Sequence, residues 1–126
     1  MKKIETKNAP AAIGPYSQAV ISNGFVYTSG QIPIVPETGR IEADTIEGQT
    51  EQVIKNLSAV LEAAGSGLDR AVKTTCFLKN MGDFAVFNEI YSEYFTSKPA
   101  RSCVEVSSLP KGALVEIEVI ATEQLL

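Results

Sequence analysis

The order of strand-like and helix-like segments limits the possible folds of this chain more than any other feature of its sequence. Apolar residues recur at helical spacing in only two segments, residues 44–64 and a segment that begins at Asp83. Strand-like segments are more numerous: they occupy residues 3–6, 17–22, 25–29 and 71–79 and the two runs that flank Pro110-Lys111-Gly112. Two helices cannot cover both faces of a six-stranded sheet, so we expect one face of the sheet to stay bare in a single copy of the chain. Further copies of the chain would bury that face, so we also expect an oligomer.

Local signals predict several turns and helix ends. Asn23-Gly24 lies between two strand-like runs and predicts a hairpin, because both turn positions need positive φ. Asp44, with Glu47 three residues later, resembles a capping box at the start of the first helix. Gly65 then predicts the end of that helix. Residues 33–43 are rich in proline and glycine and are expected to form a loop.

The second half of the chain carries a strand and an aromatic helix. In the strand at residues 71–79, alternation predicts one core-facing set: Val72, Thr74, Cys76 and Leu78. Asp83 is expected to cap the second helix. An aromatic stripe on that helix is expected to face the core, and it consists of Phe84, Phe87, Tyr91, Tyr94 and Phe95. Asn88 lies beside this stripe and could reach a site, although its position alone indicates little.

Length and charge narrow the class of protein. The chain has 126 residues, and we expect a single domain over residues 1–126. A net charge of −4 and a pI near 4.8 argue against a general nucleic-acid binder. No apolar run has the length or position of a secretory signal or a membrane span. Cys76 and Cys103 form no C-x-x-C pair, and free thiols favour the cytoplasm.

The absence of histidine restricts the chemistry more sharply. The sequence contains no histidine, so Ser–His and Cys–His nucleophile pairs and histidine-based metal sites are excluded. No carboxylate or thiol cluster has metal-ligand spacing either. Any reaction must therefore use Glu, Asp, Arg, Lys, Cys, Tyr, Ser, backbone groups or water.

The stretch from residue 99 to residue 118 holds the candidate chemistry. Arg101, Cys103 and Glu105 share one face of a strand, and Glu116 and Glu118 share one face of the next. These groups could converge where the strands end. Arginine can bind a carboxylate through two parallel hydrogen bonds, and glutamate can transfer protons. The alternative is structural: solvated strand charges with a thiol in the core, and the spacing alone favours it.

Two N-terminal segments also have open interpretations. Residues 8–16 read as an ordered apolar loop, in which Ile13 and Tyr16 either pin the loop to the core or leave Tyr16 to line a pocket. After the strand at 25–29, Ser29 and Gly30 place a hydroxyl and a glycine at a strand end. This pair either faces a ligand or simply lets the chain turn.

Three blocks of the sequence resemble the RidA/YjgF family, in the same order and spacing over nearly the whole chain. They are Ala9-Pro-Ala-Ala-Ile-Gly-Pro-Tyr-Ser-Gln18, Thr28-Ser-Gly-Gln-Ile-Pro33 and Pro99-Ala-Arg-Ser-Cys-Val-Glu-Val106, the last followed by Leu109-Pro-Lys and Val115-Glu-Ile-Glu118. The resemblance implies a chorismate-mutase-like α+β fold, with a six-stranded mixed sheet and two helices on one face, and a homotrimer with clefts between subunits. It also implies hydrolysis of 2-imino or enamine acids (2-aminoacrylate, 2-iminopropanoate and 2-iminobutanoate) to 2-oxo acids and ammonia, without a cofactor.

The resemblance also implies roles for individual residues. Arg101 would bind the substrate carboxylate, Cys103 would contribute mainly its backbone, and Glu116 would orient or activate water. Four further residues would line the cleft: Tyr16, Ser29, Gly30 and Asn88. A protonated imine is already electrophilic, so a site without histidine or metal suffices, and this favours a functional role for Arg101.

Two other readings remain open at the level of the sequence. One is a regulatory module that binds a small ligand without turnover. The other is RNA cleavage, which the acidic charge and missing histidines disfavour.

The connection at residues 95–99 looks shorter than in many family members. Its length affects the shape of the pocket rim and therefore the breadth of substrates.

Overall fold

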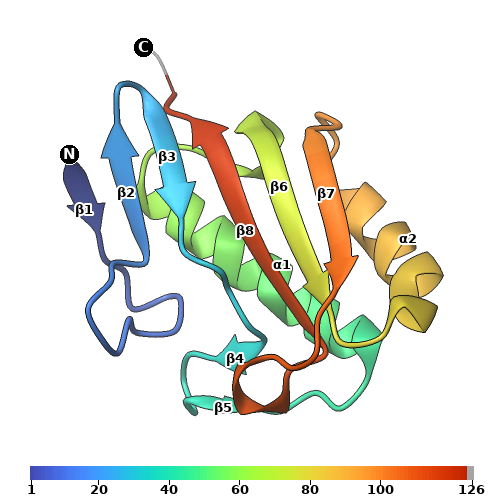
Figure 1. Ribbon diagram of the computed structural model, residues 1–126. Coiled ribbons are helices and arrows are strands. Elements are labelled where there is room, and N and C mark those ends of the chain that lie inside the picture. Colours follow the sequence, from blue (N-terminus) through green and yellow to red (C-terminus); the bar gives the residue numbers. More distant parts are fainter. Residues whose placement is uncertain (125–126) are drawn as a thin grey trace.

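In the computed structural model, which describes residues 1–124, six strands form one mixed sheet and two helices pack on one of its faces (Figure 1). The strand order is β1-β2-β3-β8-β6-β7. Only β6 and β7 are parallel, because α2 connects them. This arrangement confirms the expected α+β fold. The elements are β1 (Lys2–Ile4), β2 (Ala19–Ser22), β3 (Phe25–Thr28), α1 (Ile46–Ala63), β6 (Ala71–Leu78), α2 (Phe84–Tyr94), β7 (Ala100–Glu105) and β8 (Val115–Thr122).

Glycine signals predicted two of the turns correctly. Asn23 and Gly24 join β2 to β3 with φ values of 52° and 81°, as the hairpin requires. Helix α1 ends at Ala63, and Gly65 follows its Ala64 cap with φ of 74°; the amide of Ser66 donates to the carbonyl of Leu61 over 2.8 Å. A residue with a Cβ would be strained at the position of Gly65.

The predicted helix starts are wrong in detail. Thr45, not Asp44, caps α1: its backbone is extended, and its hydroxyl accepts a hydrogen bond from the amide of Gly48 over 3.1 Å. Asp83 precedes α2 but makes no capping bond with its side chain. A short 3₁₀ turn, Met81–Asp83, leads directly into α2, so the backbone is already helical at the expected cap.

The expected loop at residues 33–43 contains a small hairpin of β4 (Ile34–Val35) and β5 (Arg40–Ile41). Strands of two residues are too short to produce an alternation that the sequence could reveal. The hairpin is tied to α1 because the buried Asn56 amide donates to the carbonyls of Ile32 and Ile34.

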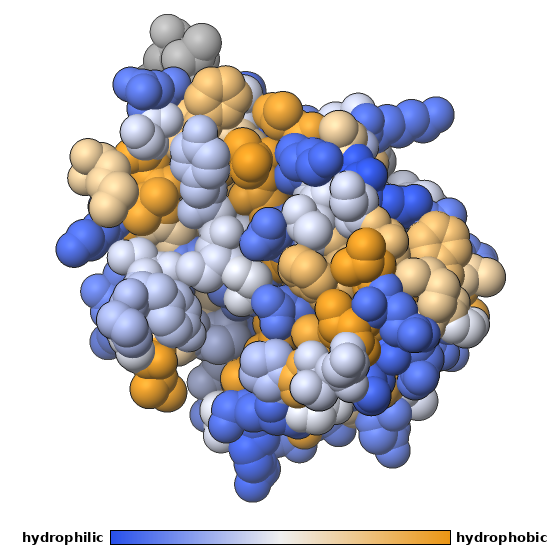
Figure 2. Space-filling model, in the orientation of Figure 1, coloured by the Kyte–Doolittle hydropathy of each residue, from blue (hydrophilic) through white to orange (hydrophobic). Residues whose placement is uncertain are grey.

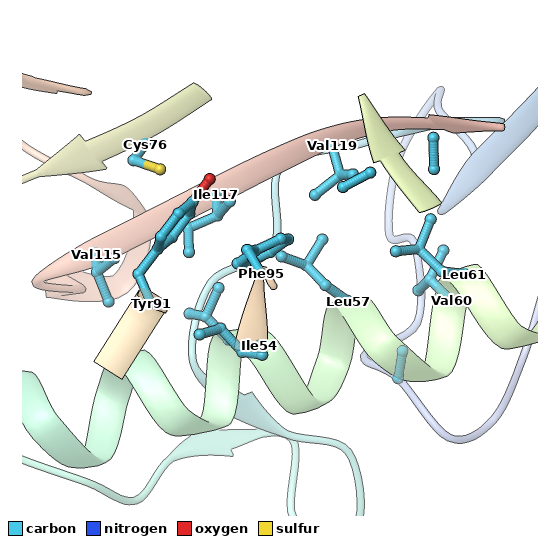
Figure 3. Close-up of a cluster of buried hydrophobic side chains, with 14 of the residues drawn as sticks. Ile54, Leu57, Val60, Leu61, Cys76, Tyr91, Phe95, Val115, Ile117 and Val119 are labelled. Carbon is cyan, nitrogen blue, oxygen red and sulfur yellow. The ribbon is translucent and has the colours of Figure 1, made fainter. Parts of the chain in front are cut away.

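The core lies between the sheet and the helices (Figure 3). Side chains of α1 meet those of β8 and α2 there, among them Ile54, Leu57, Val60, Leu61, Val115, Ile117, Val119, Tyr91 and Phe95. The aromatic stripe of α2 is buried as predicted at Phe87, Tyr91 and Phe95. Tyr94 is an exception, because it is exposed and its hydroxyl donates to the Glu51 carboxylate of α1.

One predicted core position of β6 is wrong. Thr74, Cys76 and Leu78 are buried as expected, but Val72 is 44% exposed. The register with β8 shifts between Ala71 and Lys73, so Ala71 takes the core position instead. A bulge of this kind resets the alternation of a strand, and its position depends on the partner strand.

The opposite face of the sheet carries no helix (Figure 1). Figure 2 views this face and shows apolar residues interspersed with polar ones over the strands. Phe25 and Tyr27 of β3 and Val104 of β7 are exposed. The face is therefore bare in one copy of the chain, as the shortage of helices predicted. Within residues 1–124, no helix is both long enough and apolar enough to cross a membrane.

Candidate functional site

Arg101 lies on the helix-covered face of the sheet, at the edge strand β7. Its partner across the β6–β7 ladder is Thr74, whose side chain is buried in the core. The guanidinium group donates from Nη1 to Oδ1 of Asn88 on α2 over 2.7 Å. Its carbon lies 4.7 Å from the ring centroid of Tyr91 and 5.4 Å from that of Phe84. The structure therefore brings together two predicted site residues, Arg101 and Asn88.

Within residues 1–124, no carboxylate forms an ion pair with Arg101. Among residues 1–124 the ion pair present joins Arg40 to Glu42, at the exposed β4–β5 hairpin. Asn88 occupies one donor of the guanidinium, which leaves the Nε and Nη2 edge for a planar anion. Arg101 also lines a cavity of about 560 Å³. The cavity is lined by Asn88, Tyr91, Ser92, Phe95, Thr96, Lys98, Pro99 and Arg101.

Cys103 lies two residues beyond Arg101 and opposite Cys76 across the ladder. Burial raises the pKa of the Cys103 thiol, and the positive charge of Arg101 only partly opposes this. Burial also raises the pKa of Cys76 to about 12. Both thiols are therefore protonated at neutral pH, and neither is a ready nucleophile. Because β7 is an edge strand, alternate backbone groups around Cys103 point away from β6 and are open to a ligand.

Glu116 lies on the bare face of the sheet. It pairs with Phe77 of β6. The neighbouring Cys76 is buried on the helix side, so Phe77 and its partner Glu116 point to the other face. The Glu116 side chain covers Gly30, where any Cβ would overlap its carboxylate oxygen Oε2. Beside Gly30, the hydroxyl of Ser29 donates to the carbonyl of Ser17 over 2.6 Å. Glu116, Gly30 and Ser29 thus form one cluster, and the glycine is needed there for close approach.

The Glu116 carboxyl is half-buried. Burial raises its pKa, and the nearby charge of Glu118 raises it further. A carboxyl with a raised pKa can take up and release a proton closer to neutral pH than an ordinary glutamate can. This property suits a general base, and no lysine or arginine is paired with Glu116 within residues 1–124.

Tyr16 is free to line a pocket. Ile13 is 87% exposed and Tyr16 is 54% exposed, so the alternative in which they pin the loop to the core is wrong. Gln18, which is 2% exposed, holds the loop instead. Its Oε1 accepts from the amide of Thr6 over 2.7 Å, and its Nε2 donates to the carbonyls of Thr6 and Pro10 over 3.0 and 2.7 Å. Tyr16 borders a cavity of about 520 Å³ that is distinct from the cavity at Arg101.

Sequence reasoning missed Gln18 because its role depends on partners 8 to 12 residues away. The one signal available was a polar residue placed directly before the first core position of β2. A buried amide with several backbone partners is a structural anchor, since each bond satisfies a loop group that has no partner in a helix or sheet.

The predicted convergence of Arg101, Cys103 and Glu116 within one chain is wrong. Arg101 and Cys103 lie on the helix side of the sheet, and Glu116 lies on the bare side. Strand β6 separates β7 from β8, and its alternation assigns the two sets to opposite faces. One chain therefore carries two half-sites: Arg101, Asn88 and Cys103 form one, and Ser29, Gly30 and Glu116 form the other.

Replacing Glu116 by glutamine is expected to stabilise the folded protein at neutral pH. Because the folded state raises the pKa of Glu116 above its ordinary value of 4.5, the folded state holds this proton more tightly than the unfolded state does. Stability therefore falls as pH rises from the ordinary pKa through the raised one, and glutamine escapes this loss. Thermal unfolding should give Glu116→Gln a higher Tm than the wild type at about pH 7, and a similar Tm at about pH 4.

The matched control is Glu89→Gln, which removes an exposed carboxylate on α2. This variant should show no gain at either pH. An equal Tm for wild type and Glu116→Gln at neutral pH would contradict the interpretation that Glu116 carries a cost of burial.

Comparison with known proteins gives consistent matches along the chain. A model of the family described as endoribonuclease L-PSP matches residues 6–123. AldR of Lactococcus lactis, whose name marks it as a candidate regulator, is 60% identical over 96% of this chain and 97% of its own. The 2-iminobutanoate/2-iminopropanoate deaminase of Escherichia coli is 49% identical over 98% of each chain. A crystal structure of Escherichia coli TdcF with bound serine matches with a TM-score of 0.92 and 44% identity, over 98% of this chain and 100% of that chain.

Proposed function

This chain belongs to the endoribonuclease L-PSP family, the RidA/YjgF family that its motifs resemble, and on that premise we propose that it hydrolyses 2-imino acids to 2-oxo acids and ammonia. Its substrates would be 2-iminopropanoate and 2-iminobutanoate, together with enamine tautomers such as 2-aminoacrylate. The observation that carries the proposal is the guanidinium of Arg101, which has no carboxylate partner within residues 1–124, keeps N–H donors that Asn88 does not use, and belongs to a residue that lines a cavity. The reaction needs no cofactor.

Arg101 holds the substrate in this proposal. Its Nε and Nη2 groups donate to the two oxygens of the substrate carboxylate, while Asn88 keeps the guanidinium in place. Lysine offers a point charge without this planar fork, so position 101 requires arginine rather than lysine. With the carboxylate fixed, the imine carbon next to it has a defined position, which favours attack by a positioned water.

Glu116 supplies the proton transfers. Water adds to the carbon of the protonated imine and gives up a proton to the Glu116 carboxylate. The product of this addition is a carbinolamine. The glutamic acid then returns this proton to the amine nitrogen. As the C–N bond breaks, the hydroxyl of the carbinolamine gives its proton to the Glu116 carboxylate and becomes the carbonyl of the 2-oxo acid. Ammonia leaves and takes that proton up as ammonium, which returns Glu116 to its carboxylate form. A raised pKa suits a group that must both accept and donate a proton.

The two half-sites require a second copy of the chain. Arg101 and Glu116 lie on opposite faces of one sheet, so we place Arg101 of one copy opposite Glu116 of the next. Asn88 and Cys103 accompany Arg101, and Tyr16, Ser29 and Gly30 accompany Glu116. The bare face of the sheet, with its exposed apolar side chains among polar ones, supports such an assembly, and the family resemblance favours a homotrimer with three clefts. The free thiols of Cys76 and Cys103 suit the cytoplasm, where we place the protein.

A ligand-binding regulatory module is the second candidate. It is favoured by the same observation, because an arginine with a free fork is sufficient to bind a small carboxylate. The solved structure of TdcF holds serine, and AldR carries the name of a candidate regulator. Glu116 separates the two candidates, since a sensor of carboxylates needs no base.

Purified protein is expected to accelerate the release of ammonia from imines formed in solution. A threonine dehydratase with threonine supplies 2-iminobutanoate, and semicarbazide traps the imine that survives. Adding the protein should reduce the trapped imine and speed ammonia release, because hydrolysis competes with trapping. A protein that binds 2-oxobutanoate but leaves ammonia release unchanged would be the regulatory module instead.

A further inference from the structure

Arg101 lies against a continuous wall formed by helix α2. Phe84, Asn88 and Tyr91 are spaced at i, i+4 and i+7 and therefore share one helix face. All three contact the guanidinium: Asn88 through a hydrogen bond of 2.7 Å, and the two rings at 5.4 and 4.7 Å from their centroids. Because no carboxylate within residues 1–124 pairs with Arg101, its guanidinium is held by these contacts with α2 instead.

Tyr91 is itself fixed from the sheet. Its hydroxyl and that of Thr74 form a hydrogen bond of 2.6 Å, and both side chains are buried. Thr74 is also the ladder partner of Arg101. Figure 3 shows the Tyr91 ring spanning the space from α2 to the sheet, next to Phe95, on which it stacks with centroids 4.4 Å apart. Tyr91 thus connects the core to the guanidinium through one rigid ring.

A core position would not need this pair of hydroxyls. Phenylalanine and valine at these positions would fill the same space without two polar groups to desolvate. Burial raises the pKa of Tyr91, so the phenol is neutral and meets Arg101 through its ring rather than as an anion. The hydroxyl pair therefore fixes an orientation of the ring, and the ring in turn restricts the plane of the guanidinium.

We propose that Thr74 and Tyr91 are positioning residues that aim the free N–H edge of Arg101 at the carboxylate of the substrate. This inference rests on the proposed function, since it assigns a carboxylate to Arg101. Neither residue touches the reacting atoms. Their loss would leave the positive charge in the site but would let the guanidinium plane turn, so that two parallel hydrogen bonds to a carboxylate are no longer favoured.

The test measures how well the site distinguishes a carboxylate from a neutral group of the same shape. NMR titration gives the affinity for 2-oxobutanoate and for its amide, 2-oxobutanamide, and the ratio of the two is the carboxylate preference. Tyr91→Phe and Thr74→Val should each lower this ratio about tenfold, while the affinity for the amide changes little. The double variant should be no worse than either single one, because both remove the same hydrogen bond.

Two controls separate positioning from packing. Thr74→Ser keeps the hydroxyl and should retain the wild-type ratio. Tyr94→Phe removes a hydroxyl on the same helix that bonds to Glu51 instead, and it should also leave the ratio unchanged. Equal losses for both ligands in Tyr91→Phe and Thr74→Val would show a structural role only and overturn the inference.

Arg101→Lys distinguishes this inference from the proposed function. Loss of the carboxylate preference in Arg101→Lys, with an unchanged ratio in Tyr91→Phe and Thr74→Val, would overturn the positioning role alone. An unchanged ratio in Arg101→Lys would overturn the assignment of the carboxylate to Arg101, and with it the proposed function.

Discussion

Replacing Arg101 by alanine should lower kcat/KM for imine hydrolysis roughly a thousandfold, a loss of about 4 kcal/mol of transition-state binding. The substrate carboxylate would lose both hydrogen bonds of the guanidinium, and Asn88 would lose its partner as well. Arg101→Lys should recover little of this, because lysine keeps the charge without the fork and cannot lie flat on Tyr91. Initial rates of ammonia release over a range of imine concentrations measure the effect.

Arg40→Ala is the matched control for this prediction. Arg40 is an exposed arginine on the β4–β5 hairpin, and its partner is Glu42. Its loss should leave kcat/KM unchanged, since an exposed ion pair contributes little to stability. If Arg101→Ala kept near wild-type turnover, Arg101 would be only a solvated charge at the end of a strand, which is the structural alternative that the sequence leaves open.

Two inactive variants should restore activity when their subunits are exchanged. Glu116→Gln keeps the shape and hydrogen bonding of the side chain but removes the base, so it should slow turnover about 100-fold. Arg101→Ala lacks the carboxylate anchor. If each cleft takes Arg101 from one copy and Glu116 from the next, about one cleft in four of a random equal mixture holds both intact residues. Unfolding and refolding the two variants together should therefore recover about a quarter of wild-type activity.

Two further measurements make the exchange experiment decisive. Light scattering should give each variant, and the mixture, about three times the 13.5 kDa mass of the chain. Variants mixed without unfolding should remain inactive, because subunits have not exchanged. Exchange that is complete by mass spectrometry but restores no activity would contradict a cleft that is shared between copies.

Several features of this fold follow from short segments of sequence. The Asn23-Gly24 turn and the stop at Gly65 depend on the φ values that these residues favour, so neighbours along the chain suffice to predict them. The alternation within β8 places Val115, Ile117 and Val119 in the core and Glu116 outside it, as expected. The shortage of helices predicted the bare face. The motifs themselves were sufficient to recognise the family.

Other features depend on contacts between distant segments. Val72 leaves the core because β6 has a bulge against β8. Gln18 anchors the N-terminal loop through bonds to Thr6 and Pro10, which no periodicity reveals. The contact of Tyr91 with Thr74 joins a helix to a strand 17 residues away.

The arrangement of the site shows most clearly where the sequence stops being sufficient. Alternation along a strand determines which residues share a face, so the sequence by itself grouped Arg101 with Cys103 and separated Glu116 from Val115. It does not relate the faces of two strands that are not neighbours. Strand β6 lies between β7 and β8, and its register pairs Thr74 with Arg101 and Phe77 with Glu116. Thr74 and Phe77 are three residues apart and so point to opposite faces, which is why only the tertiary structure decided that the arginine and the glutamate belong to different half-sites.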